Sequence, residues 1–221
     1  MNNFLYILAL VLVVLAQFKV NGAYARYRNV ATRRGYRGVE AARMILNQNG
    51  LHDVKIEVST GGELSDHYDP QTNTVRLSRD VYYNDSIASV AISAHEVGHA
   101  IQHATNYGFI GLRNMILPYA MISSKLGWTI LFLGIMFTLD SLFYIGIIML
   151  CVIALFQLIT LPVELNASKR ALTLLESNGI ILTEEKRDCK AMLSAAAFTY
   201  IAALISTLLQ ILRLLGRRRR D

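Results

Sequence analysis

Four long apolar blocks run along this chain of 221 residues. They extend over Asn3 to Val20, Pro118 to Leu139, Leu142 to Leu161 and Met192 to Leu215. Each has about the 20 residues that an α-helix needs to cross the hydrocarbon core of a bilayer. Hydrophobic residues make up 53% of the sequence and charged residues only 17%. The pattern therefore predicts an α-helical membrane domain of about four spans.

The first block has features of both a signal peptide and a membrane anchor. No Lys or Arg precedes it, its apolar core is long, and Gly22 to Ala25 makes only a weak cleavage site. These features favour a retained N-terminal anchor over residues 1–20 rather than a cleaved signal peptide.

Basic residues predict the orientation of the spans. One group follows the first block and a second follows the third block: Lys19, Arg26, Arg28, Arg33, Arg34 and Arg37, then Lys169, Arg170, Lys186, Arg187 and Lys190. The turn at Asp140-Ser141 has none, as an outer loop should. Since basic residues favour the cytoplasmic side, the N-terminus is predicted outside and residues 21–115 inside. The net charge of +6 fits contact with anionic headgroups better than a nucleic-acid partner, because the basic residues lie beside apolar spans.

The basic tail, residues 217–220, conflicts with this topology. If the fourth block spans the membrane, these arginines lie outside. The block enters only partway, all spans are inverted, or packing overrides the rule; these alternatives stay open.

The one sizeable polar stretch, residues 37–112, has a mixed pattern. It predicts in turn a helix, a strand, a turn cluster, a second strand and a longer helix, over residues 38–46, 54–58, 66–70, 74–77 and 86–105. This is the order of a zincin peptidase domain. A strand beside the long helix also has a use, because an extended peptide can pair with an exposed edge. Asn73 to Ser78 is the candidate, and an ordinary sheet strand is the equal alternative.

The long predicted helix contains His95-Glu96-Val97-Gly98-His99. Histidines four residues apart lie on one helix face, where both imidazoles can reach one metal ion. Glu96 beside that metal can take a proton from a bound water, as in the H-E-x-x-H motif of zinc peptidases. The alternative is two core histidines and an incidental glutamate. Small and apolar residues surround the motif, and a buried ionisable group there needs a partner such as a metal.

A catalytic zinc ion takes three protein ligands and leaves a fourth position for water. A third histidine ten residues after the first is excluded, because position 105 is Thr105. His103 lies about 12 Å along the helix from His95, too far to share the metal. Glu164 is the preferred third ligand, since two intervening spans return the chain to the side of His95. The alternative is a glutamate that caps a helix N-terminus.

Residues near this glutamate and near the motif have secondary roles. Ser168, one turn after Glu164, shares its helix face and can hydrogen-bond a ligand histidine. The donor that stabilises the reaction's oxyanion stays open among His67, Tyr68 and His103. Cys151 and Cys189 are expected to be two free thiols.

Three motifs together carry a family resemblance: DHYDP with NTVRLS, AHEVGHAIQH, and LPVELNASKRAL. In these, and over nearly its whole length, the chain resembles the YugP-type neutral zinc metallopeptidases of bacterial membranes. The resemblance implies a gluzincin-like membrane protease. It also implies that His95, His99 and Glu164 bind zinc and that Glu96 is the base. It further implies a kinship with the heat-shock and prenyl-protein membrane proteases, which usually carry an aspartate at the position of Ser168.

The predicted fold is thus an α+β zincin-like metallopeptidase domain integrated with an α-helical membrane domain of about four spans. Its parts are an anchor, a zincin-like segment, a two-span hairpin, a third-ligand helical segment and a hydrophobic segment with a basic tail, over residues 1–20, 21–115, 116–163, 164–190 and 191–221.

The predicted function is a multi-pass, Zn²⁺-dependent endopeptidase of the bacterial cell membrane, with its active site facing the cytoplasm. Expected partners are protein or peptide substrates, membrane proteins among them, the lipid bilayer, and a further copy of the chain or a membrane partner. The alternative is a non-catalytic membrane scaffold with a structural zinc site. A structural site wants four protein ligands, and the sequence offers three.

Overall fold

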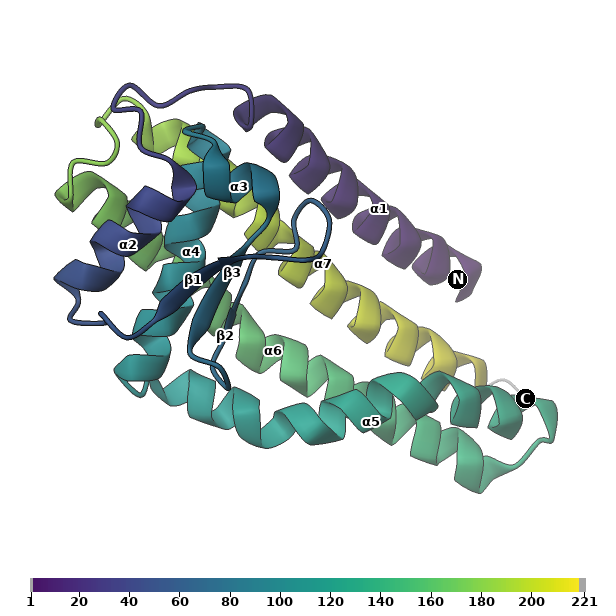
Figure 1. The fold of residues 1–221 in the computed structure, drawn as a ribbon. Coiled ribbons are helices and arrows are strands. Elements are labelled where there is room, and N and C mark those ends of the chain that lie inside the picture. Colours follow the sequence, from purple (N-terminus) through teal and green to yellow (C-terminus); the bar gives the residue numbers. More distant parts are fainter. Residues whose placement is uncertain (1, 219–221) are drawn as a thin grey trace. The chain divides into compact units, whose positions relative to one another are not determined.

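The computed structural model describes residues 2–218, and these form two compact units (Figure 1). The first, here called the mixed unit, comprises Phe18–Tyr107 and Glu164–Ala197. The second, the apolar unit, comprises Met1–Gln17, Gly108–Val163 and Phe198–Asp221. Arg219 and Arg220 of the basic tail lie outside the described residues.

The mixed unit combines helices with a small sheet, as the polar stretch of the sequence predicts. Its own elements are α2 (Gly38–Gln48), β1 (Lys55–Val58), β2 (His67–Asp69), β3 (Thr74–Leu77), α3 (Arg79–Tyr83) and α4 (Ile87–Ala104). The predicted helices over 38–46 and 86–105 and the predicted strands over 54–58 and 74–77 are confirmed within a few residues.

The N-terminus of α4 and the C-terminus of α2 are both formed by residues close by in the sequence. The side chain of Ser86 accepts a hydrogen bond from the backbone N–H of Ser89 at 3.1 Å, which caps the N-terminus of α4. After α2, Gly50 adopts φ +72°, a left-handed conformation that only glycine takes at no steric cost.

The sheet has the strand order β1-β3-β2, with β1 parallel and β2 antiparallel to β3. The prediction that Asn73 to Ser78 forms an exposed edge is therefore wrong, because β3 is paired on both sides. Val75 and Leu77 of β3 are fully buried, as a central strand requires. The two edges of the sheet are formed by β1 and β2, and β2 packs against α4.

β2 and α3 were not predicted from the sequence. The turn cluster at 66–70 contains a strand, since Tyr68 pairs with Val75. The turn itself follows, where Asp69 accepts hydrogen bonds from the backbone N–H of Gln71 and the hydroxyl of Thr72 at 2.9 and 2.7 Å. A three-residue strand has almost no periodicity of its own, and here its pairing with β3 forms it.

One hydrophobic core holds the mixed unit together. Ile45 and Leu46 of α2 and Val90 of α4 are fully buried in it. Ala171 and Leu175, which come about 70 residues after the end of α4 in the chain, belong to the same core. The segment that carries the predicted third ligand therefore packs as an integral part of this unit.

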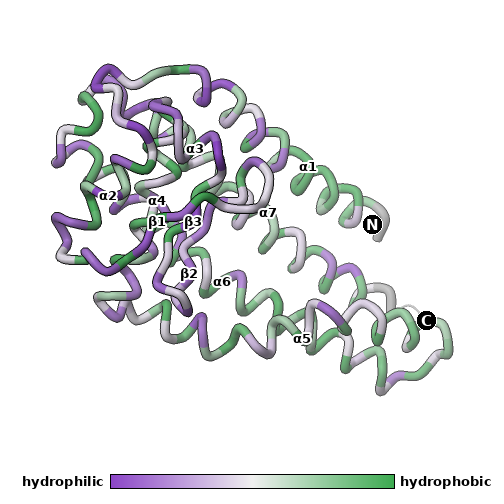
Figure 2. Tube along the Cα trace, viewed as in Figure 1, coloured by the Kyte–Doolittle hydropathy of each residue, from purple (hydrophilic) through white to green (hydrophobic). Residues whose placement is uncertain are grey.

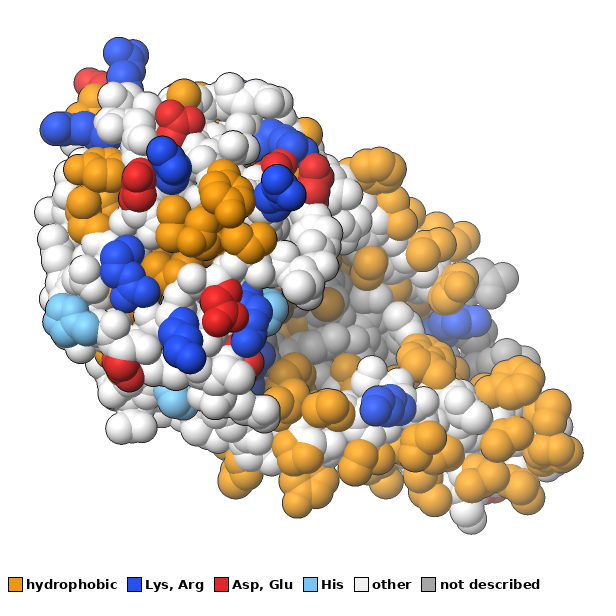
Figure 3. Space-filling model, viewed as in Figure 1, with side chains coloured by type: hydrophobic (Ala, Val, Ile, Leu, Met, Phe, Trp, Pro, Cys, Tyr) orange, Lys and Arg blue, Asp and Glu red, His pale blue; other side chains and the backbone are white. Residues whose placement is uncertain are grey.

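Among residues 2–218, four helices are long and apolar enough to cross a membrane: α1 (Asn2–Tyr27), α5 (Gly108–Met136), α6 (Asp140–Ser177) and α7 (Lys186–Arg218). Figure 2 shows long hydrophobic stretches along each of them. The predicted blocks all form helices, which extend beyond the apolar residues at most ends. Large hydrophobic side chains stay exposed in the apolar unit, for example Phe132 and Ile148, both at 62% (Figure 3).

Within the apolar unit, α5 and α6 form the predicted hairpin. Their turn lies at residues 137–139, just before the expected Asp140-Ser141, and Thr138 takes φ +54° there. A Cβ atom on Gly146 would lie 2.8 Å from the Cα of Leu131, so glycine permits a close approach of the two helices. Among the described residues both cysteines are free, as expected: Cys151 is exposed and Cys189 is buried.

Candidate metal centre

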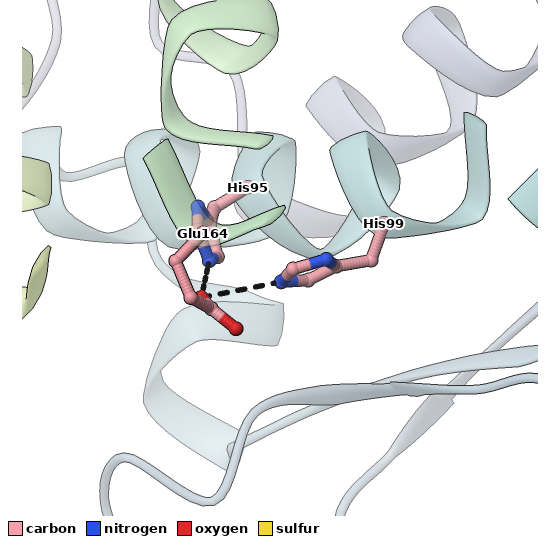
Figure 4. A group of neighbouring side chains, drawn as sticks. All are labelled: His95, His99 and Glu164. Carbon is pink, nitrogen blue, oxygen red and sulfur yellow. Dashed lines mark hydrogen bonds and ion pairs between the residues drawn. The ribbon is translucent and has the colours of Figure 1, made fainter. Parts of the chain in front are cut away.

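His95 and His99 lie on one face of α4, as their spacing predicts (Figure 4). Their ring centroids are 4.7 Å apart and the rings are nearly perpendicular. Both side chains are largely buried, with 15% and 16% of their surface exposed. The two imidazoles therefore lie next to each other, and each keeps part of its surface in contact with solvent.

Glu164 of α6 points at the same place (Figure 4). Its Oε2 lies 3.3 Å from the Nε2 of His95 and 3.5 Å from the Nε2 of His99. The structure therefore brings the three predicted ligands together, with their candidate ligand atoms all within 4.8 Å of one another.

These distances are those of a long hydrogen bond and an ion pair, and they also fit a tetrahedral metal site. Hydrogen bonds between nitrogen and oxygen span about 2.7–3.2 Å, shorter than both distances. In a tetrahedral zinc site with bonds of about 2.0–2.2 Å, neighbouring ligand atoms lie about 3.3–3.6 Å apart. Two imidazoles and one carboxylate are also a donor set that zinc prefers, and three ligands leave one position open.

Glu96, the residue after His95, is buried with 8% of its surface exposed. Burial by itself lowers the pKa of His99, but the adjacent Glu164 and the charge of Glu96 outweigh it and raise that pKa above its ordinary value. The carboxylates of Glu96 and Glu164 therefore act on the same small volume. Buried carboxylates need a compensating positive charge, which a protonated histidine or a metal ion can supply.

Asp66 is a third carboxylate near the site, and the sequence analysis missed it. Burial, with the charge of Glu96 added, raises its pKa to about 6. Asp66 accepts hydrogen bonds from the backbone N–H and the hydroxyl of Ser78 at 2.7 and 3.1 Å. It immediately precedes β2 and ties the start of that strand to the end of β3. Nothing in its local pattern distinguishes it from a turn aspartate.

A hydrogen-bonded chain fixes the ring of His99. Its Nδ1 lies 3.0 Å from the Oε1 of Gln102, whose Nε2 donates to the Oδ1 of Asn166 at 3.0 Å. Asn166 also accepts from the Nε of Arg170 at 2.8 Å. Because the Oε1 of Gln102 can accept a hydrogen bond from Nδ1, this contact favours the neutral tautomer in which Nε2 is free to bind a metal. This role of Gln102 and Asn166 was not predicted from the sequence, because Asn166 lies 64 positions away in the chain.

Ser168 supports His95 in the same way. Its hydroxyl lies 3.2 Å from the Nδ1 of His95, so the predicted hydrogen bond to a ligand histidine is present. Both histidines thus use Nδ1 for a supporting partner and direct Nε2 toward Glu164. This arrangement is typical of metal-binding histidines.

Gly98 lets α4 and α6 approach each other closely. A Cβ atom at this position would lie 2.9 Å from the carbonyl oxygen of Ala167, which is fully buried. Ala167 sits between Glu164 and Ser168 in the chain. The missing side chain of Gly98 is therefore what allows both residues to reach the histidines.

The three candidate oxyanion donors do not join this group. The Nδ1 of the exposed His67 lies 2.8 Å from the carbonyl oxygen of Ser65. The Tyr68 hydroxyl donates to the Oδ1 of Asn73 at 2.9 Å. The ring of His103 lies 5.9 Å from that of Tyr68. Tyr68 and His103 instead face each other beside the end of α4.

The fold and the site together define a class: a protein with a candidate two-histidine, one-glutamate metal centre and four helices apolar enough to cross a membrane. The family described as "Putative neutral zinc metallopeptidase" matches residues 3–219, and the chain belongs to this family. It is 44% identical over 210 residues to the "Putative membrane protease YugP" of Bacillus subtilis (strain 168), covering 95% of this chain and 93% of that protein. No solved structure shows a significant match to the chain.

Proposed function

We propose that this chain is a zinc-dependent endopeptidase of the bacterial membrane that hydrolyses peptide bonds, with Glu96 as general base. The observation that carries the proposal is the convergence of three ligand atoms within 4.8 Å of one another, with Glu164 Oε2 at tetrahedral spacing from the Nε2 atoms of His95 and His99. Membership in a family named for neutral zinc peptidases supports it. In this proposal the mixed unit corresponds to the peptidase domain of a zincin. Its metal centre is of the gluzincin type, in which the third ligand is a glutamate on a second helix.

His95 and His99 would hold the metal through Nε2, and Glu164 through a carboxylate oxygen. Bound zinc would lower the pKa of a coordinated water to about 7 and polarise the substrate carbonyl. Ser168 and Gln102 keep each imidazole in the tautomer that leaves Nε2 free for the metal.

Glu96 has the position and the burial that a base needs. It follows His95 directly on α4, and its charge acts on His99. In the proposed reaction its carboxylate takes a proton from the attacking water and delivers it to the departing amine. A buried carboxylate holds that proton between the two steps without losing it to bulk water.

β2 offers a place for the substrate backbone. It is the edge strand next to α4, and its outer side pairs with no other strand among residues 2–218. An extended peptide that adds to this edge would run past the helix that carries both histidines. β2, rather than β3, is thus the strand that we propose pairs with an extended substrate.

The activity is tested by comparing the zinc-loaded wild-type protein with Glu96→Gln in detergent micelles. Glutamine keeps the shape of the side chain but cannot accept a proton at neutral pH, so peptide cleavage should fall by about 10²–10⁴-fold. Zinc content should stay at the wild-type level. Equal cleavage by a metal-loaded Glu96→Gln protein would show that the base is another residue. Absence of cleavage by both proteins with zinc bound would favour a non-catalytic scaffold.

The proposed topology has four spans, with the metal centre in the cytoplasm. It rests on the arginines after the first span, as well as on the placement of His95 and Glu164 in one unit. Substrates would then be membrane proteins or peptides near the membrane surface, and a second copy of the chain is a possible partner. The proposal includes no nucleic acid.

Single cysteines test this topology in a background with Cys151→Ala and Cys189→Ala. Gly62→Cys and Ser177→Cys should be protected from an impermeant thiol reagent in intact cells, and Ser141→Cys should be labelled. The opposite pattern would invert the molecule while sparing the site. Labelling at only one of positions 62 and 177 would contradict a shared centre of His95 and Glu164.

A further inference from the structure

A pocket of about 310 Å³ lies against the C-terminal part of α4, the helix that carries His95 and His99, within the mixed unit. Its apolar wall comes from Leu51, Val54 and Ala100. Its volume is at the low end of ligand pockets, which hold about 300–1,000 Å³. The pocket therefore suits one long side chain better than a whole small-molecule ligand.

The position of the pocket relative to the histidines is set by α4. His103 lines the pocket and follows His99 by four residues, which is one turn and about 6 Å along the helix. An extended peptide advances about 3.3 Å per residue. A side chain in the pocket would therefore belong to a residue about two positions from the peptide bond at the metal.

β2 connects the pocket to the proposed path of the substrate. Tyr68, the middle residue of this edge strand, lines the pocket, and its ring faces that of His103 at 5.9 Å. A peptide bound along the edge of β2 would thus pass both the metal centre and the pocket mouth.

The polar end of the pocket is negatively charged. Asp53 is exposed there, and its Oδ2 accepts a hydrogen bond from the Nδ2 of Asn73 at 2.8 Å. A carboxylate can accept several further hydrogen bonds beyond this one. Burial raises the pKa of Tyr68, and the charges of Asp53 and Asp69 raise it further. Asp69 is neutralised by its ion pair with Arg76 at 2.8 Å, so Asp53 supplies the uncompensated charge.

We propose that this pocket binds a lysine or arginine side chain of the substrate, about two residues from the cleaved bond. The aliphatic stem would lie along Leu51, Val54 and Ala100, as such stems do on apolar surfaces. The cationic group would meet the Asp53 carboxylate and the ring of Tyr68. This inference rests on the proposed peptidase function and adds to it a preference for basic substrates.

Binding is measured first, without cleavage, on the full-length zinc-loaded Glu96→Gln protein in micelles. The probes are nonapeptides of otherwise uncharged sequence in which one lysine is moved through each position. Norleucine at the same position gives an uncharged partner of similar length. The best lysine peptide should bind about tenfold more tightly than its norleucine partner, from an exposed ion pair and a cation–π contact.

Three further substitutions locate the preference. Asp53→Asn keeps an acceptor for Asn73 but removes the charge, and should bring the ratio of lysine to norleucine binding close to one. Asp53→Lys should reverse it, so that a glutamate peptide binds best. Glu184→Gln removes one exposed negative charge of the same unit that does not line the pocket, and should leave the ratio unchanged. Zinc content and thermal unfolding of each variant establish that it is folded.

The outcomes separate the pocket from the activity. Equal binding of lysine and norleucine peptides at every position, or a preference that survives Asp53→Asn, overturns the pocket assignment. Wild-type protein that cleaves peptides without a basic preference leaves the peptidase standing and removes the pocket. A preference that depends on Asp53, together with no cleavage by zinc-loaded wild type, keeps the pocket and removes the peptidase.

Discussion

The two halves of α6, one in each unit, differ in how far their side chains are exposed. In the apolar unit α6 exposes Ile148 and Leu155, at 62% and 47%. In the mixed unit the same helix leaves only 5% of the Glu164 surface exposed and buries Ala167 completely. One half thus presents hydrocarbon to its surroundings, and the other half encloses a charge.

The physical reason lies in the solvent that each half requires. Exposed large aliphatic side chains are tolerated where lipid replaces water, because no apolar surface is then hydrated. A buried carboxylate is tolerated only beside cations or hydrogen-bond donors, and Glu164 faces His95 and His99. A helix can therefore have a continuous backbone while the environment of its side chains changes along its length.

Removal of one ligand should have the largest effect on the mixed unit. His95→Ala or His99→Ala leaves too few donors for a catalytic zinc site, so bound zinc should fall from about one to less than about 0.1 per chain. Elemental analysis of the purified protein measures this. His52→Ala, an exposed histidine outside the group, is the control. Full zinc in either ligand variant would contradict the assigned centre.

A charge introduced into the exposed half of α6 tests whether this half faces lipid. Ile148→Arg should cost about 2.5–3.5 kcal/mol if that surface faces lipid at the centre of the bilayer. The fraction of protein that resists alkaline extraction from membranes should then fall. Val58→Arg makes a similar change at an exposed position of the mixed unit and should change stability by less than about 0.5 kcal/mol. Similar behaviour of the two variants would remove the distinction between the units.

The close approach of α4 and α6 can be weakened without touching a ligand. Gly98→Ala places a methyl group against the backbone of Ala167, and this overpacking should cost about 1–3 kcal/mol. Thermal unfolding and zinc affinity, measured by competition with a chelator, should both decrease. Gly22→Ala is the matched control, since this helical glycine has no atom within 4 Å of the added Cβ. A stabilised Gly98→Ala protein with normal zinc affinity would show that the contact does not set the geometry.

The smallest expected effect concerns the support of His95. Ser168→Ala removes the partner of its Nδ1 and should weaken zinc binding by about 10–100-fold while the protein stays folded. Ser168→Asp supplies a stronger acceptor and should restore or exceed the wild-type affinity. Ser177→Ala, an exposed position near the end of the same helix, should have no effect. Unchanged affinity in Ser168→Ala would limit this hydroxyl to a packing role.

Features that depend only on residues close together in the sequence could be predicted from the sequence. The spacing of His95 and His99 is a property of any helix, so their convergence followed from the motif alone. The apolar blocks determined four helices because each has the length and composition of a span. The cap at Ser86 and the end of α2 at Gly50 likewise depend on neighbouring residues only.

Features that depend on distant partners appear only in the folded chain. β2 exists because Tyr68 meets Val75, and β3 became the central strand because β1 also pairs with it. The chain of hydrogen bonds from Gln102 to Asn166 joins residues 64 positions apart, and no local pattern encodes it. The pocket at Asp53 is formed in the same way, from a loop, an edge strand and the end of α4. Such contacts form only once the core has fixed the distances between elements, which is why residue spacing in the sequence does not reveal them.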